Sequence, residues 1–360
     1  MLVKTSAWQG RRVLVTGHTG FKGGWLSLWL HQLGAEVTGF SLPAPTEPSL
    51  FEQTRLAELV NHIEGDVRDM AAVEAAVNAA NPEVVFHLAA QPLVRYSYDN
   101  PIETYATNVM GTVHLLDACR RAGSVRAVVS VTSDKCYENR EWIWPYRESD
   151  PMGGHDPYSS SKGAAELVIS AYRRSFFETG ARIASVRAGN VIGGGDWATD
   201  RLIPDIVRAM LAGERPLIRN PNSVRPWQHV MEALGGYLLI AERLLEGRDD
   251  FASGWNFGPS EDDAKPVGWI VDRMLDMWGA EGWDRPTGSQ PHEATLLKLD
   301  CSKARAALGW RPRFSLEKAL EKVVEWHKGA AAGEDARQLS FRQLAEYSKL
   351  GSVGAGEVPA

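Results

Sequence analysis

The 360-residue sequence contains few cysteines, no long apolar run and no excess of basic charge. Its three cysteines are far apart and form no Cys-x-x-Cys pair, which argues against a disulfide framework and a zinc site. No stretch of 18 apolar residues favours a membrane helix, and residues 1–11 lack the apolar core of a signal peptide. With 39 basic and 45 acidic residues, the chain has no basic stripe for nucleic acid. We therefore expect a cytoplasmic protein without a metal, a membrane or a nucleic-acid partner.

Short β-branched runs alternate with helical patterns through the first half of the chain. Strands are expected at Arg12–Thr16, Glu36–Phe40, Val60–Asp66, Val84–Ala89, Ala127–Thr132 and Arg182–Val186. The helices between them are expected at Trp25–Leu33, Ala71–Ala80, Ile102–Arg121 and Ser159–Phe177. This alternation predicts an α/β protein with a doubly wound parallel sheet of the Rossmann type.

The second half is broken into shorter pieces by proline and glycine. Helices are expected there at Ile203–Leu211, Met231–Leu245, Val267–Met277 and Leu316–His327. Loops beyond the carboxyl ends of parallel strands are where such folds bind ligands. We therefore predict a smaller C-terminal lobe, made of residues 189–229 and 259–350, that covers this edge and binds the substrate. Residues 1–188 and 230–258 would form the Rossmann domain, and the small-residue tail 351–360 is expected to be disordered.

A glycine-rich loop separates the first strand from the first helix. Gly17, Gly20 and Gly23 are spaced G-x-x-G-x-x-G, with Thr19 and the pair Phe21-Lys22 between them. Glycines permit a tight turn and let backbone N–H groups approach a pyrophosphate at the helix N-terminus. The position at the first strand–helix junction predicts a dinucleotide site, although glycine spacing alone would be weak evidence.

The expected contacts for the adenosine end are less distinctive. The second strand ends in Gly39-Phe40-Ser41-Leu42, without the acidic residue that binds the ribose of NAD or an arginine for the extra phosphate of NADP. This position therefore does not distinguish the two cofactors. Asp66 and Val67 follow the third strand and are candidate adenine contacts, but Asp66 could instead cap the next helix.

Two groups of side chains carry the predicted chemistry. Tyr158 and Lys162 are four residues apart on one helix face, where the ammonium group is expected to lower the phenol pKa from about 10. Ser133, Asp134 and Lys135 end the fifth strand, where a hydroxyl and two titratable groups would face the nicotinamide. An exposed charged turn is the alternative for Asp134 and Lys135.

With these motifs the sequence resembles the extended short-chain dehydrogenase/reductases, and within them the nucleotide-sugar 4,6-dehydratases, from about Trp8 to Tyr347. The similar stretches are TGHTGFKGGWL, FHLAAQPLVRYSY, TSDKCYEN, YSSSKGAAE, RAGNVIGGGDW, RPWQHV and HEATLLKLDCSKA. The resemblance implies NAD as the bound cofactor and CDP-glucose as the substrate. The implied reaction oxidises C4 of the glucose, eliminates water across C5 and C6, and returns the hydride to C6, so that NAD is regenerated.

The resemblance also assigns roles. Tyr158 would take the proton of the 4-hydroxyl, and Asp134 would protonate the departing 6-hydroxyl. Lys135 occupies the place of a glutamate base in the dTDP-glucose enzymes, so it either removes the C5 proton or only orients Asp134; we favour the base. Ala89 and Ala90, after the fourth strand, would contact NAD together with Tyr158 and Lys162.

Substrate contacts are expected from residues spread along the chain: Gln91, Arg95, Asn190, Arg219, Arg225 and His292. Arg219 and Arg225 are candidates for the pyrophosphate because a guanidinium binds two oxygens at once. The family pairs its two long helices across a twofold axis, which implies a homodimer, and it supplies deoxysugars for bacterial surface polysaccharide. Alternatives are a nucleotide-sugar epimerase or reductase, a dehydratase of another nucleotide hexose, and a dinucleotide sensor without catalysis.

Overall fold

The computed structural model describes residues 3–178, 180–286 and 297–350, so the tail 351–360 lies outside the described residues. Its centre is a seven-stranded parallel sheet in the order β3-β2-β1-β4-β5-β6-β9. The strands are β1 (Arg12–Thr16), β2 (Glu36–Ser41), β3 (Asn61–Glu64), β4 (Val84–His87), β5 (Ala127–Val131), β6 (Arg182–Ala188) and β9 (Gly254–Phe257). The predicted doubly wound parallel sheet is confirmed, and β9 adds a strand that the sequence patterns did not indicate.

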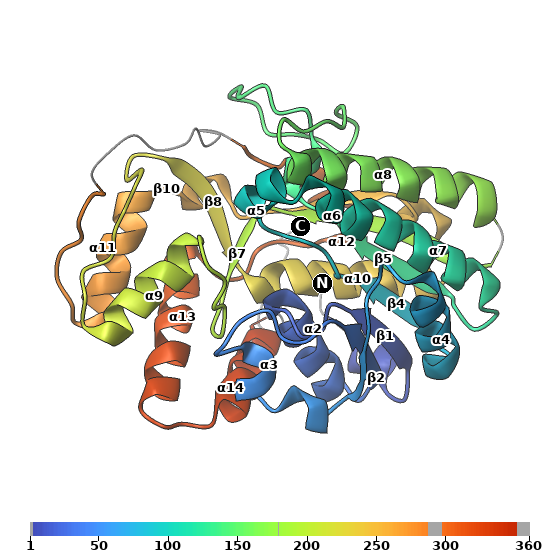
Figure 1. Ribbon diagram of the computed structural model, residues 1–360, viewed down its shortest axis with the longest axis horizontal. Helices are drawn as coiled ribbons and strands as arrows, with labels where there is room; N and C mark the ends of the chain where they lie inside the picture. The colour runs from blue at the N-terminus through green and yellow to red at the C-terminus, as the bar shows by residue number, and fades with distance from the viewer. Residues whose placement is uncertain (1–2, 179, 287–296, 351–360) are drawn as a thin grey trace, which may run out of the picture.

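Helices cover both faces of this sheet because alternate strand residues point to opposite sides. Val84 and Phe86 of β4 belong to one apolar cluster, whereas Val85 between them belongs to the other. The first cluster includes residues of α2 (Phe21–Gln32) and α10 (Val230–Leu245), and the second includes residues of α4 (Met70–Ala80), α7 (Gly111–Arg121) and α8 (Pro157–Phe176). Figure 1 shows α7 and α8 side by side, away from α2.

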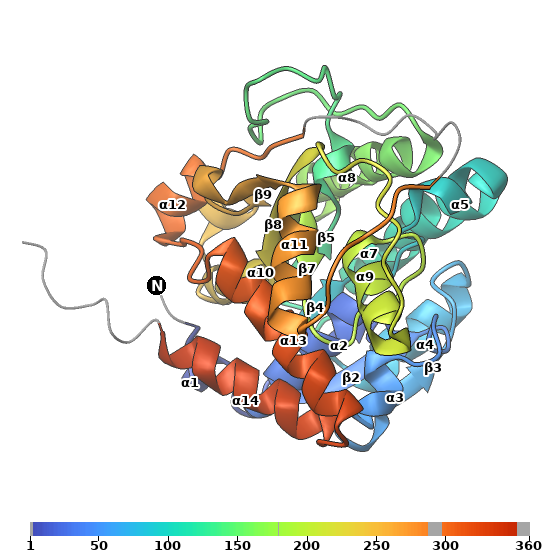
Figure 2. The same cartoon turned by 90° about the vertical axis from the view of Figure 1, so that its left-hand side faces the viewer.

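A second group of elements surrounds a three-stranded sheet in the order β10-β8-β7. Its strands are β7 (Asn190–Ile192), β8 (Val224–His229) and β10 (Ala264–Pro266), and its helices are α9 (Leu202–Ala212), α11 (Val267–Trp278) and α13 (Leu316–Ala331). These helices share an apolar cluster and lie together in Figure 2. The shorter helices of the chain are α1 (Thr5–Trp8), α3 (Leu50–Gln53), α5 (Val94–Asp99), α6 (Pro101–Tyr105) and α12 (Ser302–Leu308).

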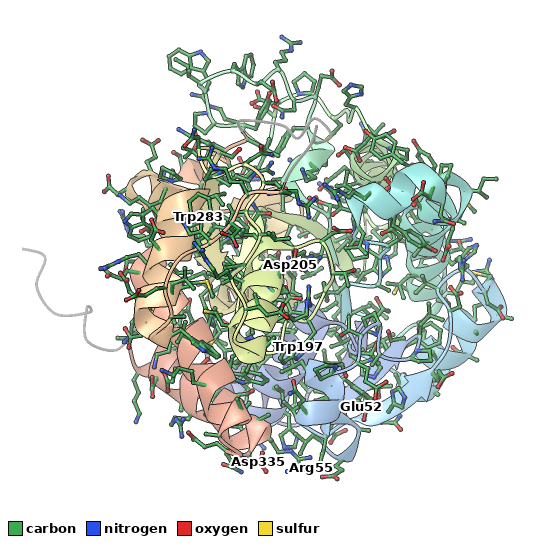
Figure 3. The ribbon with its side chains drawn as sticks, turned by 60° about the vertical axis from the view of Figure 1, so that its left-hand side comes forward. Glu52, Arg55, Trp197, Asp205, Trp283 and Asp335 are labelled. Carbon is green, nitrogen blue, oxygen red and sulfur yellow. The ribbon has the colours of Figure 1, made fainter. Side chains whose placement is uncertain are left out.

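The last helix, α14 (Ala336–Lys349), packs back against the first half of the chain. The ring of Tyr347 contacts Trp29 of α2 edge-on, with 5.6 Å between ring centroids. Asp335, just before α14, forms an ion pair of 2.6 Å with Arg55, and Figure 3 shows the two side chains next to each other. Within the described ranges, no helix combines the length and the apolar character that crossing a membrane requires.

Two helix predictions need correction. The first helix begins at Phe21 instead of Trp25, because Gly20 is already its N-cap and the loop glycines continue into the helix. The helix expected over Ile102–Arg121 is interrupted by a π-helical turn, η2 (Ala106–Met110), between α6 and α7. Such turns often mark functional sites, and this one buries Asn108, whose amide Nδ2 donates to Ser161 Oγ at 2.8 Å.

The buried His327 on α13 provides a prediction about stability. It lies between Trp197 and Trp326, with 4.9 Å between ring centroids in each case, and within the described chain neither of its ring nitrogens has a hydrogen-bond partner. Burial lowers its pKa from 6.5 to about 3. Between pH 6.5 and pH 3, this imidazole therefore binds a proton in the unfolded chain but not in the folded chain. Protonation of His327 in the unfolded chain thus lowers the free energy of unfolding as the pH falls below 6.5.

His327→Phe is expected to remove that sensitivity. Between pH 8 and pH 5, the free energy of unfolding of the wild-type protein should fall by about 2 kcal/mol more than that of the variant. Denaturant unfolding at both pH values measures the difference. Identical pH dependence of the two proteins would contradict the depressed pKa.

Candidate active site

A cavity of about 1360 Å³ lies at the carboxyl ends of β1, β4, β5 and β6, which exceeds the roughly 300–1,000 Å³ typical of one small ligand. It brings together nearly all predicted site residues: Gly17, Thr19, Gly20, Phe21, Lys22, Gly23, Asp66, Val67, Ala89, Ala90, Arg95, Ser133, Asp134, Lys135, Tyr158, Lys162, Asn190, Arg219 and Arg225. Gln91 does not line the cavity, and its side-chain amide Nε2 donates a hydrogen bond to Thr104 Oγ1 at 2.9 Å. His292 lies outside the described residues.

The glycine loop has no room for side chains at two of its positions. Gly17 has φ +76°, and a Cβ there would lie 2.7 Å from the backbone nitrogen of Ala89. A Cβ at Gly23 would lie 2.1 Å from the Gly17 carbonyl oxygen. The turn therefore keeps the N-terminus of α2 open toward the cavity, where its free N–H groups favour an anion. These residues fit the pyrophosphate of the expected NAD.

Gly23→Ala tests this fit. The added methyl group must displace the Gly17 carbonyl, because backbone atoms cannot give way as a flexible side chain does. We expect NAD affinity to fall about tenfold or more in calorimetric titration. Gly123→Ala is the matched control, since its Cβ would meet no atom within 4 Å. Equal affinity of the two variants would contradict the assignment of the loop to NAD.

Hydroxyl groups take the place of a carboxylate at the end of β2. Thr19 Oγ1 and Ser41 Oγ are 2.8 Å apart, and Thr19 also donates to the Leu42 carbonyl at 2.9 Å. Asp66 binds the guanidinium of Arg68 at 2.5 and 2.8 Å, and this hydrogen bonding lowers the pKa of Asp66. Asp69, not Asp66, caps α4. The helix-cap alternative for Asp66 is therefore excluded, and Asp66 remains a candidate adenine contact.

The turn that follows β5 faces the N-terminal part of α8. Ser133 Oγ donates to Asp134 Oδ1 at 3.0 Å and accepts from the backbone N–H of Lys135 at 3.2 Å. Ser133 also faces the phenol of Tyr158, since its hydroxyl lowers the pKa of that phenol. The phenol, the hydroxyl and the carboxyl group therefore lie together at one wall of the cavity, and all three side chains are buried. The exposed-turn alternative for Asp134 does not describe this arrangement.

The pKa of Tyr158 differs from the expectation. Burial raises it to about 12, while Ser133 and the charge of Arg201 oppose the increase. Lys162 is not among the groups that lower it: its Nζ points to the Val131 carbonyl at 3.4 Å, and burial lowers its own pKa to about 8. The lowering of the phenol pKa expected from Lys162 is therefore not found. Tyr158 needs further positive charge to ionise near neutral pH, and the nicotinamide ring, expected to act in the same direction as Lys162, would supply it.

Burial also raises the pKa of Asp134, against the opposing effects of Lys135, Ser133, Arg225 and Lys22. A raised pKa keeps more of this carboxyl group protonated, as a proton donor requires. Lys22 lies near the same carboxylate, and burial together with the charges of Arg201 and Lys162 lowers its pKa to about 8. The site thus combines a carboxyl group that resists ionisation with several cations.

The predicted substrate arginines occupy different parts of the cavity wall. Arg95 of α5 and Arg219 both pair with Asp200, at 3.4 and 3.2 Å. Arg225 lies in β8. Its positive charge acts on Asp134 and opposes the increase in pKa that burial causes there. Asn190 begins β7 and pairs with Trp227 of β8. Arg219 and Arg225 therefore approach the cavity from separate segments.

Sequence reasoning missed one residue of the cavity wall, Arg201, and one buried residue outside the cavity, Asn108. Arg201 lines the cavity, pairs with Asp196 at 3.3 Å and acts on both Lys22 and Tyr158. Asn108 accepts a hydrogen bond from the backbone N–H of Gln91 at 2.9 Å. Neither belongs to a motif that the sequence analysis used; Arg201 follows an irregular segment, and the π-helical turn that buries Asn108 has no simple sequence pattern.

Comparison with known proteins assigns the chain to a family. Residues 13–252, more than half of the chain, match the model of the NAD dependent epimerase/dehydratase family. The chain belongs to this family. The resemblance to extended short-chain dehydrogenase/reductases is thereby confirmed, and NAD is the cofactor that the family uses.

Members of the family with known activity are similar over nearly the whole chain. A CDP-glucose 4,6-dehydratase of Salmonella typhimurium is 56% identical over 353 residues, covering 96% of this chain and 98% of that protein. A dTDP-glucose 4,6-dehydratase of Streptomyces antibioticus is 30% identical and covers 88% of this chain and 92% of its own length. The crystal structure of the dTDP-glucose 4,6-dehydratase of Streptomyces venezuelae with NAD has a TM-score of 0.75 at 26% identity, covering 91% of this chain and 99% of that one.

Proposed function

We propose that the protein catalyses the 4,6-dehydration of CDP-D-glucose, giving CDP-4-keto-6-deoxy-D-glucose and water, with NAD as its resident cofactor. The observation that carries this proposal is the turn Ser133-Asp134-Lys135 at the wall of the same cavity as Tyr158, Lys162 and the glycine loop. Oxidation at C4 needs only a base and NAD, whereas elimination also needs an acid and a base near C5 and C6. An epimerase or a simple reductase would leave Asp134 and Lys135 without a task.

In this proposal the first step belongs to Tyr158 and Ser133. Ser133 orients the 4-hydroxyl of the glucose, and Tyr158 removes its proton. The chemistry that NAD supplies when bound is reversible acceptance of two electrons and a proton from a sugar carbon. Because burial holds the pKa of Tyr158 at about 12 in the protein alone, positive charge close to the phenol favours its ionised form.

Elimination would then use the turn after β5. The 4-ketone acidifies the C5 proton, which the neutral amine of Lys135 removes, while Asp134 gives its proton to the departing 6-hydroxyl. Lys135 would then return the proton to C5 as the stored hydride returns to C6, which gives the 4-keto-6-deoxy product and restores NAD. Burial raises the pKa of Asp134, so its protonated form is favoured. These roles of Lys135 and Asp134 agree with their chemistry, because the neutral amine of a lysine is a stronger base than the carboxylate of an aspartate.

The choice of CDP-glucose rests on similarity. The relative with 56% identity acts on a CDP sugar, and the less similar dehydratases act on dTDP sugars. We propose that residues 1–188 and 230–258 bind NAD, while 189–229 and 259–350 bind the nucleotide sugar through Asn190, Arg219 and Arg225. The cations of the cavity suit two diphosphate groups.

We further propose a cytoplasmic homodimer whose product serves deoxysugar synthesis for surface polysaccharide. Large apolar side chains are exposed on α6, on the π-helical turn η2 and on α8: Ile102 is 85% and Leu167 63% exposed, and Phe176 and Met110 are also exposed. Figure 1 shows these helices on one side of the molecule. A surface of this kind is typical of a contact between subunits. The three cysteines are unpaired and buried, which agrees with a reducing compartment.

The test is incubation of the NAD-loaded protein with CDP-glucose, UDP-glucose and dTDP-glucose in parallel. We expect conversion of CDP-glucose to a product that has lost one water, identified by mass spectrometry, with no net consumption of NAD. Conversion of dTDP-glucose at a higher kcat/KM would contradict the assigned nucleotide. Stoichiometric consumption of NAD without loss of water would contradict dehydration.

A further inference from the structure

A buried ion pair lies beneath the catalytic turn. Glu166 of α8 and Arg187 of β6 are each 4% exposed, and two guanidinium nitrogens of Arg187 bind the two carboxylate oxygens at 2.8 Å each. Burial opposes ionisation of Glu166, but the charge and hydrogen bonds of Arg187 outweigh it and lower the pKa of Glu166. The pair is therefore charged, and neither residue lines the cavity.

The ion pair is hydrogen-bonded to both ends of the turn that carries Ser133, Asp134 and Lys135. On one side, Thr132 Oγ1 donates to Glu166 Oε1 at 2.5 Å. On the other side, Arg187 Nη1 donates to the hydroxyl of Tyr137 at 2.6 Å. Only the turn itself lies between these two attachment points. Its position is therefore fixed from both ends by one buried pair.

Glu166 also belongs to the helix that carries the other half of the site. Tyr158, Lys162 and Glu166 are spaced by four residues on α8, so they share one face of the helix. The helix packs closely on the turn, since a Cβ at Gly163 would lie 3.2 Å from the Cys136 carbonyl oxygen. A displacement of the turn relative to Glu166 is consequently a displacement of Asp134 and Lys135 relative to Tyr158.

We propose that Glu166 and Arg187 are positioning residues that hold the Ser133–Lys135 turn in register with Tyr158, an inference that rests on the proposed function. Removal of a buried pair's partner is costly to folding, whereas the pair itself contributes little net stability compared with apolar side chains. Misplacement of a catalytic group by about 1 Å can lower a rate about 100-fold. We therefore attribute the buried Glu166–Arg187 pair to its effect on the position of the turn relative to Tyr158, and not to a contribution to stability.

The chain offers a matched set of variants. Thr132→Val and Tyr137→Phe each remove one hydroxyl that joins the ion pair to the turn. Ser185→Ala removes a hydroxyl that donates to Glu166 Oε2 at 2.7 Å but lies on β6, away from the turn. Glu166 itself is left unchanged, because its loss would leave Arg187 buried without a counter-charge. Thr132→Ser restores the hydroxyl and serves as the rescue.

The experiment uses the full chain loaded with NAD and measures unfolding in denaturant together with kcat and KM for CDP-glucose. We expect similar losses of stability in Thr132→Val, Tyr137→Phe and Ser185→Ala. The kcat should fall about 10- to 100-fold in the two turn variants with KM little changed, stay within about twofold in Ser185→Ala, and recover in Thr132→Ser.

Other outcomes are decisive. An equal loss of kcat in Ser185→Ala, or an unchanged kcat in both turn variants, would overturn the inference and leave the proposed function intact. A wild-type protein that does not convert CDP-glucose would overturn the proposed function, and the inference with it.

Discussion

Tyr158→Phe is expected to lower kcat for CDP-glucose by about 100- to 10,000-fold, the range of a lost general base. The substitution keeps the buried ring and removes only the phenol oxygen, whose pKa the hydroxyl of Ser133 lowers. Without this oxygen, the proton of the 4-hydroxyl has no acceptor in the proposed mechanism. Binding should be nearly unchanged, because the phenol acts on a proton and the anionic groups of both ligands are held elsewhere in the cavity.

Tyr237→Phe is the control for this variant. Tyr237 is also a buried tyrosine near Tyr158, and in the described chain its hydroxyl has no hydrogen-bond partner. It does not line the cavity, so its variant should keep kcat within about twofold of the wild type. Steady-state kinetics, with calorimetric binding of NAD and of CDP-glucose, distinguish the two tyrosines. Equal activity of Tyr158→Phe and Tyr237→Phe would remove Tyr158 from the mechanism.

Lys135→Ala is expected to stop the reaction after oxidation at C4. Product formation should fall about 100- to 10,000-fold, while the near-ultraviolet absorbance of the cofactor still changes when CDP-glucose is added. The reason is that Tyr158 and Ser133 remain in place, whereas the C5 proton has lost its base. Stopped-flow absorbance and mass spectrometry of the product follow the two parts separately. Wild-type product formation by this variant would exclude Lys135 as a catalytic residue.

Asp134→Asn separates the two possible roles of Lys135. If Lys135 is the base, the Asp134→Asn protein still exchanges the C5 proton in D2O, so the recovered CDP-glucose carries deuterium at C5. The Lys135→Ala protein then gives CDP-glucose without deuterium at C5. If Lys135 only orients Asp134, C5 exchange persists in Lys135→Ala as well. Nuclear magnetic resonance of the recovered substrate therefore decides between the base and an orienting role.

The sheet and the glycine loop could be predicted because they depend on local patterns. Apart from the polar β3 (Asn61–Glu64), the strands from Arg12 to Val186 are mainly apolar runs of the right length, and Gly17 and Gly23 are needed for a close backbone approach. The spacing of Tyr158 and Lys162 likewise fixes their common helix face. In each case the physical requirement lies within a short stretch of sequence, so the sequence carries it.

What could not be predicted depends on packing between distant segments. The four-residue strand β9 is recognisable only by its pairing with β6. The pKa of Tyr158 is raised because tertiary burial outweighs the charges around it, and spacing along one helix does not report burial. Arg201 and Asp200 reach the cavity from an irregular segment, and Glu166 meets Thr132 across 34 positions of sequence.

The most direct measurement follows a deuterium label at C4 of CDP-glucose through one turnover. The account requires the protein to keep the label while Tyr158 oxidises C4 and the turn at Ser133–Lys135 expels the 6-hydroxyl. We predict that the label reappears at C6 of the same molecule, detected by nuclear magnetic resonance of the 4-keto-6-deoxy product. Loss of the label to solvent, or its retention at C4, would contradict the account.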